Sequence, residues 1–154
     1  ELTHKYGGNW RVIVRLHPNI KNLQNRLFYT DRIINGSNYE ETDELIIASS
    51  WVITDYSGCM FEALEARKKV MLYAVDVEKY MMEDRGAYWD IYNLPFPLAK
   101  SNEELRMCIR NFDEITYNER CEKLRKKIGY FNTADSSKKV VDEIIKRVWG
   151  DEYK

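Results

Sequence analysis

Residues 51–66 read WVITDYSGCMFEALEA, and they are the most informative part of the sequence for the architecture. A short apolar run, Trp51–Ile53, stops at the polar pair Thr54-Asp55, and the small residues Ser57-Gly58 come next. Helical spacing of apolar residues then begins at Phe61, which predicts a strand, a tight turn and a helix in succession. Such a junction places unpaired amides and a serine hydroxyl at the carboxyl edge of a parallel sheet, a geometry that suits a phosphate.

The segments on either side of this junction continue an alternation of strands and helices. Three further β-rich runs are expected as strands, at residues 10–16, 32–35 and 70–73. Helices are expected near 42–48, 57–67, 101–112, 116–128 and 136–148, while 19–28 is helical or irregular. Two Ser/Thr-x-x-Glu capping boxes, Ser101 with Glu104 and Thr116 with Glu119, support two of these helices. The pattern predicts an α/β fold: a Rossmann-like, doubly wound parallel sheet with a helical C-terminal tail.

Composition narrows the class of protein. The chain has 154 residues with 44% hydrophobic and 32% charged side chains, which is ordinary for a soluble globular domain. A formal net charge of −1 gives no electrostatic reason to expect nucleic acid as a partner. Three scattered cysteines without a C-x-x-C pair disfavour a zinc site or a disulfide framework, and no metal is expected. The chain starts without Met, so we expect a fragment of a longer protein.

The predicted turn supplies the first candidate site residues. Ser57, with the amides of Gly58 and Cys59, would hold a phosphate, while Asp55 would shape the turn and Gly58 would let the backbone approach closely. An ordinary N-cap serine is the alternative interpretation of the same residues.

Three other places along the chain offer candidates. His17 follows the first predicted strand and precedes Pro18, and it could donate to a phosphate oxygen or be an ordinary loop residue. Arg85, beside Gly86, could present its guanidinium to the same anion or lie in an exposed turn. The pair Lys138-Lys139, at the start of the last helix, fits a solvated face, although a cation in the first helical turn opposes the helix dipole.

In order and spacing, these pieces resemble one family. Its carboxyl-terminal half has similar motifs at Leu16-His17-Pro18, Val52–Ser57, Leu72-Tyr73 with Asp76-x-Glu78-x-Tyr80, and Arg85-Gly86-x-Tyr88, and a similar closing segment at 131–145. The family is that of the CDP-glycerol glycerophosphotransferases, the poly(glycerol phosphate) polymerases and primases of wall teichoic acid synthesis. The resemblance spans residues 10–148, and the ordered set of motifs is more specific than any one of them.

The resemblance implies that residues 1–154 form one donor-nucleotide domain of a GT-B fold, lacking the amino-terminal acceptor domain. An acceptor hydroxyl would attack the β-phosphorus of CDP-glycerol and CMP would leave, with no cofactor. His17 would be the catalytic contact to the pyrophosphate. The phosphates and nucleotide would be bound by Asp55, Ser57, Gly58, Arg85, Ser137 and Lys139. The full-length protein would act on a lipid-linked acceptor, in the cytoplasm and peripherally on the inner face of the membrane, and the fragment alone would not turn over.

Departures from the family pattern leave the donor open. The family usually has a second serine where this chain has Gly58, an arginine where it has Lys139, and Pro-Gly-Pro where it has Pro95-Phe96-Pro97. Ribitol or another polyol phosphate is therefore an alternative donor. A GT-B sugar transferase using a nucleotide sugar and a non-catalytic Rossmann-like interaction module are further alternatives.

Overall fold

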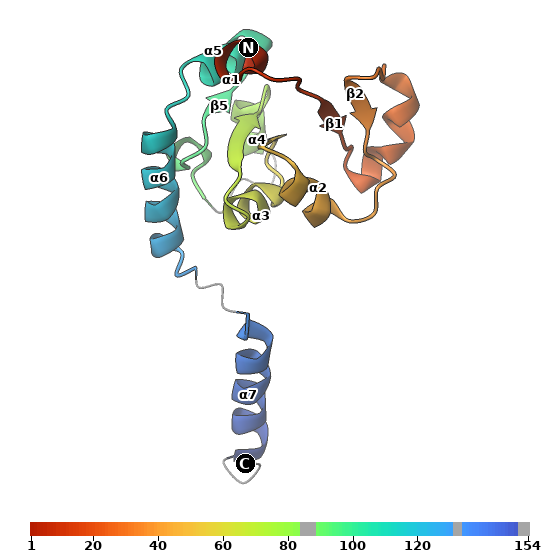
Figure 1. Cartoon of the computed structure of the whole chain (residues 1–154). Helices are drawn as coiled ribbons and strands as arrows, with labels where there is room; N and C mark the ends of the chain where they lie inside the picture. The colour runs from red at the N-terminus through yellow and green to blue at the C-terminus, as the bar shows by residue number, and fades with distance from the viewer. Residues whose placement is uncertain (84–88, 131–133, 151–154) are drawn as a thin grey trace. The chain divides into compact units, whose positions relative to one another are not determined.

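A computed structural model describes residues 1–83, 89–130 and 134–150 of the chain (Figure 1). The chain divides into two units, Glu1–Cys121 and Glu122–Lys154. The first unit carries both sheets and most of the helices. In the second, helix α7 (Ser136–Trp149) follows the end of α6 (Glu114–Lys127).

The strands of the first unit form two parallel sheets. In one, β1 (Val12–Val14) pairs with β2 (Ile33–Asn35), and in the other the order is β3 (Trp51–Thr54), β4 (Lys69–Tyr73), β5 (Leu98–Ala99). All three ladders are parallel, which confirms the predicted α/β class. The four predicted strands are present. Strand β5 was not predicted, because it has only two residues, directly after a proline, and so shows no strand pattern. Among the described residues no ladder joins the two sheets.

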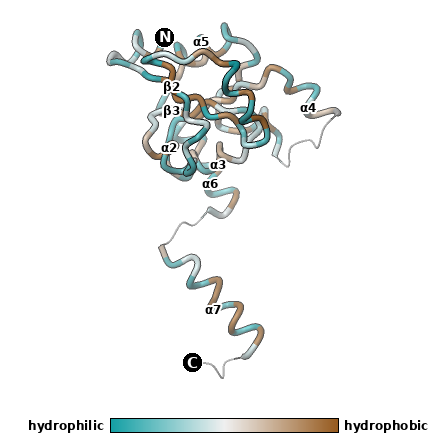
Figure 2. Tube along the Cα trace, turned by 90° about the vertical axis from the view of Figure 1, so that its right-hand side faces the viewer, coloured by the Kyte–Doolittle hydropathy of each residue, from teal (hydrophilic) through white to brown (hydrophobic). Residues whose placement is uncertain are grey.

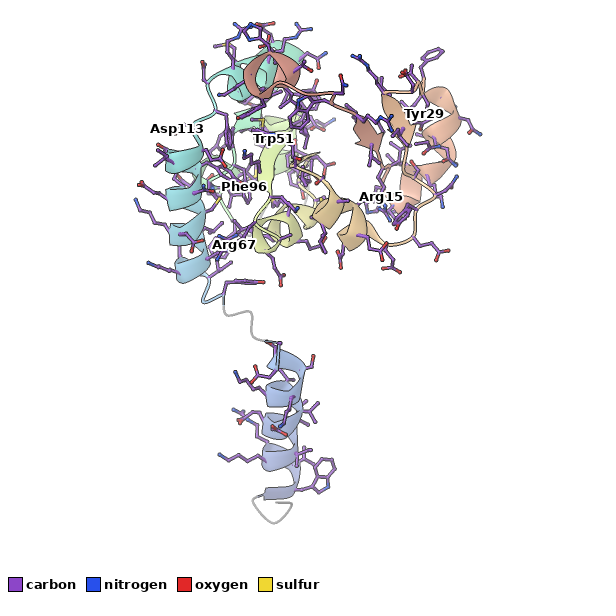
Figure 3. The ribbon with its side chains drawn as sticks, in the orientation of Figure 1. Arg15, Tyr29, Trp51, Arg67, Phe96 and Asp113 are labelled. Atoms are coloured by element: carbon purple, nitrogen blue, oxygen red, sulfur yellow. The ribbon has the colours of Figure 1, made fainter. Side chains whose placement is uncertain are left out.

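The connections between strands are helical, as the alternation predicted. The elements outside the strands, in chain order, are α1 (Leu2–Tyr6), the 3₁₀ segment η1 (Pro18–Arg26), α2 (Thr42–Ala48), α3 (Cys59–Glu65), α4 (Val77–Glu83), the 3₁₀ turn η2 (Ile91–Asn93), α5 (Asn102–Arg110), α6 and α7. Helix α3 packs on β3 and β4, and α5 packs on β5. Arg67, labelled in Figure 3, follows α3 with a left-handed φ of 55°.

Of the two predicted capping boxes, the first is confirmed at its serine cap, while its glutamate bonds the amide one residue before the cap. The Glu104 amide donates to Ser101 Oγ at 3.2 Å, and the Glu104 carboxylate in turn accepts from the Lys100 amide at 2.7 Å. The box predicted at Thr116 is wrong, because α6 begins two residues earlier, at Glu114. There Asp113 is the capping side chain and accepts from the Ile115 amide at 3.1 Å. An aspartate before the helix competes successfully with the later threonine for the same role.

Strand β4 is the centre of the core. Val70, Met71 and Leu72 are almost completely inaccessible to solvent, on both faces of the sheet. This is why the run is continuously apolar instead of alternating. The labelled side chains Trp51 and Phe96 in Figure 3 belong to this three-stranded part. Trp51 packs edge-on against Phe112 with ring centroids 4.6 Å apart.

Apolar side chains outside this core remain exposed. On the two-stranded sheet Val12 is 55% and Ile13 45% accessible, unlike the buried faces that parallel strands usually have. In the second unit, the apolar stripe of α7, visible as brown segments in Figure 2, is more than half accessible at Val140 and Val148. None of the helices within the described ranges is both long and apolar enough to cross a membrane.

Gly36 gives a test of the packing in the two-stranded sheet. Its amide donates to the Val14 carbonyl at 2.8 Å, and a Cβ at this position would lie 2.5 Å from Ile13 Cγ2. We therefore expect Gly36→Ala to lower the free energy of unfolding by about 1–3 kcal/mol, as overpacking does. Urea unfolding followed by circular dichroism measures this loss.

The matched control for Gly36→Ala is Gly58→Ala, where an added Cβ meets no atom within 4 Å. The double variant Gly36→Ala/Ile13→Ala should recover part of the loss, since removing the Ile13 branch makes room. Equal stability of Gly36→Ala and the parent chain would contradict this account of the contact.

Candidate functional site

The Thr54–Gly58 turn joins β3 to α3 and contains three of the predicted site residues. The Ser57 amide donates to Asp55 Oδ1 at 3.0 Å, so the aspartate shapes the turn from within. Thr54 Oγ1 lies 3.2 Å from Cys59 Sγ and links the end of the strand to the start of the helix. The turn forms here because the β-branched residues of the strand end at Asp55. A short polar side chain of this kind can accept from the backbone amide two residues later.

A serine hydroxyl and two backbone amides at this turn take no part in its internal hydrogen bonds. Within the described part of the chain, no hydrogen bond involves Ser57 Oγ, and no acceptor is present for the amides of Gly58 and Cys59. Helix α3 has seven residues, so its dipole adds little and these local donors are what an anion would meet. Ser57 does not cap α3, which disfavours the ordinary N-cap interpretation.

The role expected for Gly58, close approach of a ligand to the backbone, stays a prediction. It is the N-cap residue of α3 with φ −55° and ψ −22°, a conformation open to every L-residue. No neighbouring atom lies near the place of a Cβ. The glycine is thus not required by the backbone or by close packing within the protein, and only a ligand approaching it could make its small size matter.

His17 lies three residues after the end of β1 and is the N-cap of η1. Its Nδ1 accepts from the Asn19 amide at 3.2 Å, and the imidazole is exposed. A neutral ring whose Nδ1 accepts must carry its proton on Nε2, which leaves one N–H donor directed away from the backbone. Pro18 at the first position of η1 fixes the turn behind it.

The predicted residues are only partly brought together. Asp55, Ser57 and Gly58 share the Thr54–Gly58 turn, whereas His17 belongs to the other sheet and, across the described ranges, shares no hydrogen bond with them. Their common crevice therefore stays a prediction. Arg85 lies outside the described residues. In the second unit, Ser137 is exposed on α7 and Lys139 pairs with Asp135 at 3.1 Å.

Sequence reasoning missed a cluster beside the turn. The Tyr56 hydroxyl donates to Asp76 Oδ1 at 2.7 Å, and the ring stacks on Tyr80 with centroids 3.9 Å apart and planes 5° apart. Burial and this bond to Asp76 raise the pKa of Tyr56. The Asp76-x-Glu78-x-Tyr80 spacing was visible in the sequence, but no local pattern links it to a tyrosine twenty residues earlier.

A second missed group is Arg15, two residues before His17 and labelled in Figure 3. Its Nη2 donates to the Glu40 carbonyl at 3.4 Å, and its Nε is buried without a hydrogen-bond partner among the described residues. This places a cation close in sequence to the imidazole, at the carboxyl end of β1.

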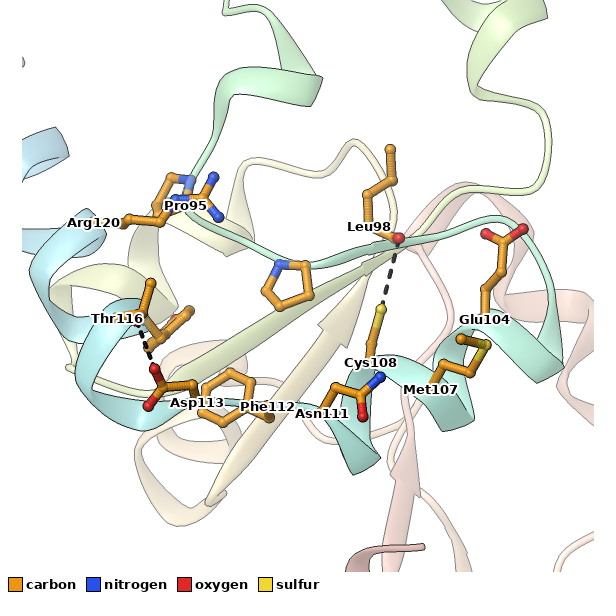
Figure 4. A pocket seen from close by; sticks show the side chains of 12 residues that line it. Pro95, Leu98, Glu104, Met107, Cys108, Asn111, Phe112, Asp113, Thr116 and Arg120 are labelled. Atoms are coloured by element: carbon orange, nitrogen blue, oxygen red, sulfur yellow. Dashed lines mark hydrogen bonds between the residues drawn. The ribbon is translucent and has the colours of Figure 1, made fainter.

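The cavity shown in Figure 4 lies elsewhere. It has a volume of about 470 Å³ between the segment 95–98, α5 and α6, and none of the predicted site residues lines it. Cys108 in its wall donates to the Leu98 carbonyl at 3.7 Å, and burial raises the pKa of its thiol, so it is a poor nucleophile at neutral pH. The described residues contain no cluster of His, Cys, Asp and Glu that could hold a metal ion.

Parallel strands joined by helices define an α/β domain, a class in which ligands bind beyond the carboxyl ends of the strands. A family model described as CDP-Glycerol:Poly(glycerophosphate) glycerophosphotransferase matches residues 1–146. The chain therefore belongs to the CDP-glycerol glycerophosphotransferase family.

Relatives of known function agree with this assignment. A teichoic acid poly(glycerol phosphate) polymerase of Bacillus spizizenii is 29% identical over 94% of this chain and 37% of its own length. A teichoic acid poly(ribitol-phosphate) polymerase of the same organism is 30% identical over 86% of this chain and 21% of its own. The chain thus spans about a third or less of these relatives.

A solved structure supports the GT-B type of fold. The wall teichoic acid polymerase TagF is 27% identical, with a TM-score of 0.72 over 95% of this chain and 36% of that one. A TagF variant has also been solved after a soak with CDPG.

Proposed function

We propose that this chain is the donor-binding part of an enzyme that transfers glycerol phosphate from CDP-glycerol to a hydroxyl of a teichoic acid acceptor, releasing CMP. The observation that carries the proposal is the family match over residues 1–146, which includes a turn whose Ser57 hydroxyl and neighbouring amides have no partner among the described residues. The resemblance of the flanking motifs, with His17 first among them, supports the same assignment.

The transfer requires little covalent chemistry from the protein. The acceptor oxygen forms a bond to the β-phosphorus of CDP-glycerol, the bond from that phosphorus to the bridging oxygen breaks, and the bonding pair leaves with CMP. Negative charge grows on the bridging and nonbridging oxygens, where fixed N–H and O–H donors stabilise it. His17 would act through Nε2–H and Ser57 through its hydroxyl. The base that takes the acceptor proton is expected in the amino-terminal domain of the full-length enzyme.

Ribitol phosphate is a second candidate for the transferred group. The poly(ribitol-phosphate) polymerase is as similar to this chain as the glycerol enzyme is, and Gly58 departs from the usual serine of the family. The two donors share the cytidine and the pyrophosphate and differ only in the length of the polyol. The groups named above contact the shared part and would accept either donor.

The remaining parts of the assignment concern the full-length enzyme. Its acceptor would be a lipid-linked teichoic acid chain, bound through the amino-terminal domain, and it would work in the cytoplasm at the inner face of the membrane. Further contacts to the phosphates or nucleotide are proposed for Arg85, Ser137 and Lys139. The family usually has an arginine at the position of Lys139, and a lysine offers a single point charge instead of a bidentate group.

Isothermal titration calorimetry of the chain with CDP-glycerol, CDP-ribitol and UDP-glucose tests the proposal. We expect binding of the cytidine compounds, weaker than in a complete enzyme, and no heat from UDP-glucose at the same concentration. A chain that bound UDP-glucose and not CDP-glycerol would belong with the sugar transferases. Absence of binding to all three would favour a non-catalytic module, and repeated turnover by the chain alone would contradict the donor-only role.

A further inference from the structure

The motif Asp76-x-Glu78-x-Tyr80 has no role in the transfer just proposed, yet the structure brings its three side chains into specific contacts. Asp76 accepts from the Tyr56 hydroxyl at 2.7 Å, and Tyr80 stacks on the Tyr56 ring. Glu78 forms an ion pair with Lys100 just after β5. Two of the three contacts end on the residue between Asp55 and Ser57.

We propose that Tyr56, Asp76 and Tyr80, here called the tyrosine clasp, are positioning residues that hold the Thr54–Gly58 turn in its anion-binding form. The inference rests on the proposed function and adds to it the device that preorganises the donor site. The clasp acts through the turn and does not itself contact the reacting atoms.

The clasp complements the bond that Asp55 makes inside the turn. Asp55 fixes the Ser57 amide from one side, and the clasp fixes the backbone of Tyr56 from outside through its side chain. Ordering one residue costs about 1–2 kcal/mol of conformational entropy. A turn that is already ordered in the free protein does not pay that cost when the ligand binds, so affinity rises without an added contact.

The anchor on the other side of the clasp is itself well held. Val77, the first residue of α4, is completely buried, and Glu78 ties the same helix to Lys100. Tyr80 lies one helical turn after Asp76, and its amide donates to the Asp76 carbonyl at 2.9 Å. Asp76 and Tyr80 are therefore presented together at the start of α4, and Tyr56 contacts both.

The clasp also fixes the two carboxylates beside the turn, Asp55 and Asp76. Hydrogen bonds to neutral donors hold one oxygen of each carboxylate in place, although they leave its negative charge unchanged. Each is engaged by a donor from the turn: Asp55 by the Ser57 amide and Asp76 by the Tyr56 hydroxyl. Because the hydroxyl of Tyr56 stays protonated, this donation persists at neutral pH.

The test uses three variants of the Tyr56–Asp76 bond. Tyr56→Phe removes the donor, Asp76→Ala removes the acceptor, and Asp76→Asn keeps an acceptor. The control is Tyr29→Phe, which loses a comparable bond, from its hydroxyl to the Gln24 carbonyl at 3.1 Å, away from the turn. Two quantities are measured well below each variant's Tm: hydrogen exchange of the Ser57 amide without ligand, and the Kd for CDP-glycerol by calorimetry.

Tyr56→Phe and Asp76→Ala should each speed exchange in the turn and weaken CDP-glycerol binding by about 5- to 30-fold, the equivalent of the cost of ordering one residue. Asp76→Asn keeps an acceptor and should stay within about twofold of the parent chain. Tyr29→Phe should leave both readouts unchanged.

Two outcomes separate the clasp from the proposed function. If Tyr56→Phe lowers Tm but changes turn exchange and Kd no more than Tyr29→Phe does, the cluster is only structural and the inference is wrong. If the parent chain binds no CDP-glycerol, the proposed function fails, and the exchange data still decide whether the clasp orders the turn.

Discussion

Replacing His17 with alanine should weaken the affinity of the chain for CDP-glycerol by about 10- to 150-fold, the range for a hydrogen bond to a charged group. The reason is the fixed tautomer: Nδ1 already accepts from the Asn19 amide, so the Nε2 proton is the donor available to a phosphate oxygen. Calorimetry with CDP-glycerol and with CDP measures the loss, and both ligands should suffer equally because both carry the pyrophosphate.

His4 provides the matched control for this experiment. It is the other histidine of the chain, it lies exposed on α1, and no role is assigned to it. His4→Ala should leave both affinities unchanged. If the two alanine variants bind alike, His17 is an ordinary cap of η1 and the assignment of the pyrophosphate contact is wrong.

Replacing Tyr117 with phenylalanine should lower the free energy of unfolding by about 1–3 kcal/mol, the cost of leaving a buried backbone group without a partner. The Tyr117 hydroxyl accepts from the Val70 amide at 2.9 Å and donates to the Lys68 carbonyl at 3.0 Å. It thus satisfies two backbone groups at the start of β4, the central strand. The ring itself is buried against Phe112 and is retained in the variant.

Chemical unfolding in urea measures the effect, with Tyr73→Phe as the comparison. The Tyr73 hydroxyl donates to Asn102 Oδ1 at 3.1 Å in an exposed position, where water replaces the lost bond. Its removal should cost less than about 0.5 kcal/mol. A Tyr117 variant as stable as the Tyr73 variant would show that the Val70 amide finds another partner.

Much of the fold was readable from the sequence because local chemistry sets it. The strand at Trp51–Thr54 ends where β-branched and aromatic residues give way to Asp55, and α5 begins where Ser101 can cap it. Strand β5 was not predicted, because two residues are too few to show the alternation typical of a strand. The start of α6 was misplaced because two candidate caps stand close together and local sequence does not rank them.

The candidate site was predictable only where it is local. The contact of Asp55 with the Ser57 amide spans two residues and follows from their types. Tyr56 and Asp76 meet only because β4 and the start of α4 bring them together, a tertiary event without a sequence period. For the same reason, local sequence patterns do not predict the distance between His17 and the Thr54–Gly58 turn.

The two-stranded sheet has a practical consequence for anyone who purifies this chain. Exposed isoleucine and valine side chains, on two short strands that pair with no third strand among the described residues, favour association of one molecule with another. A net charge of −1 provides almost no repulsion between molecules to oppose this. Titrations are therefore best run on dilute samples whose molecular mass is checked by light scattering, since aggregation would mimic a low binding capacity.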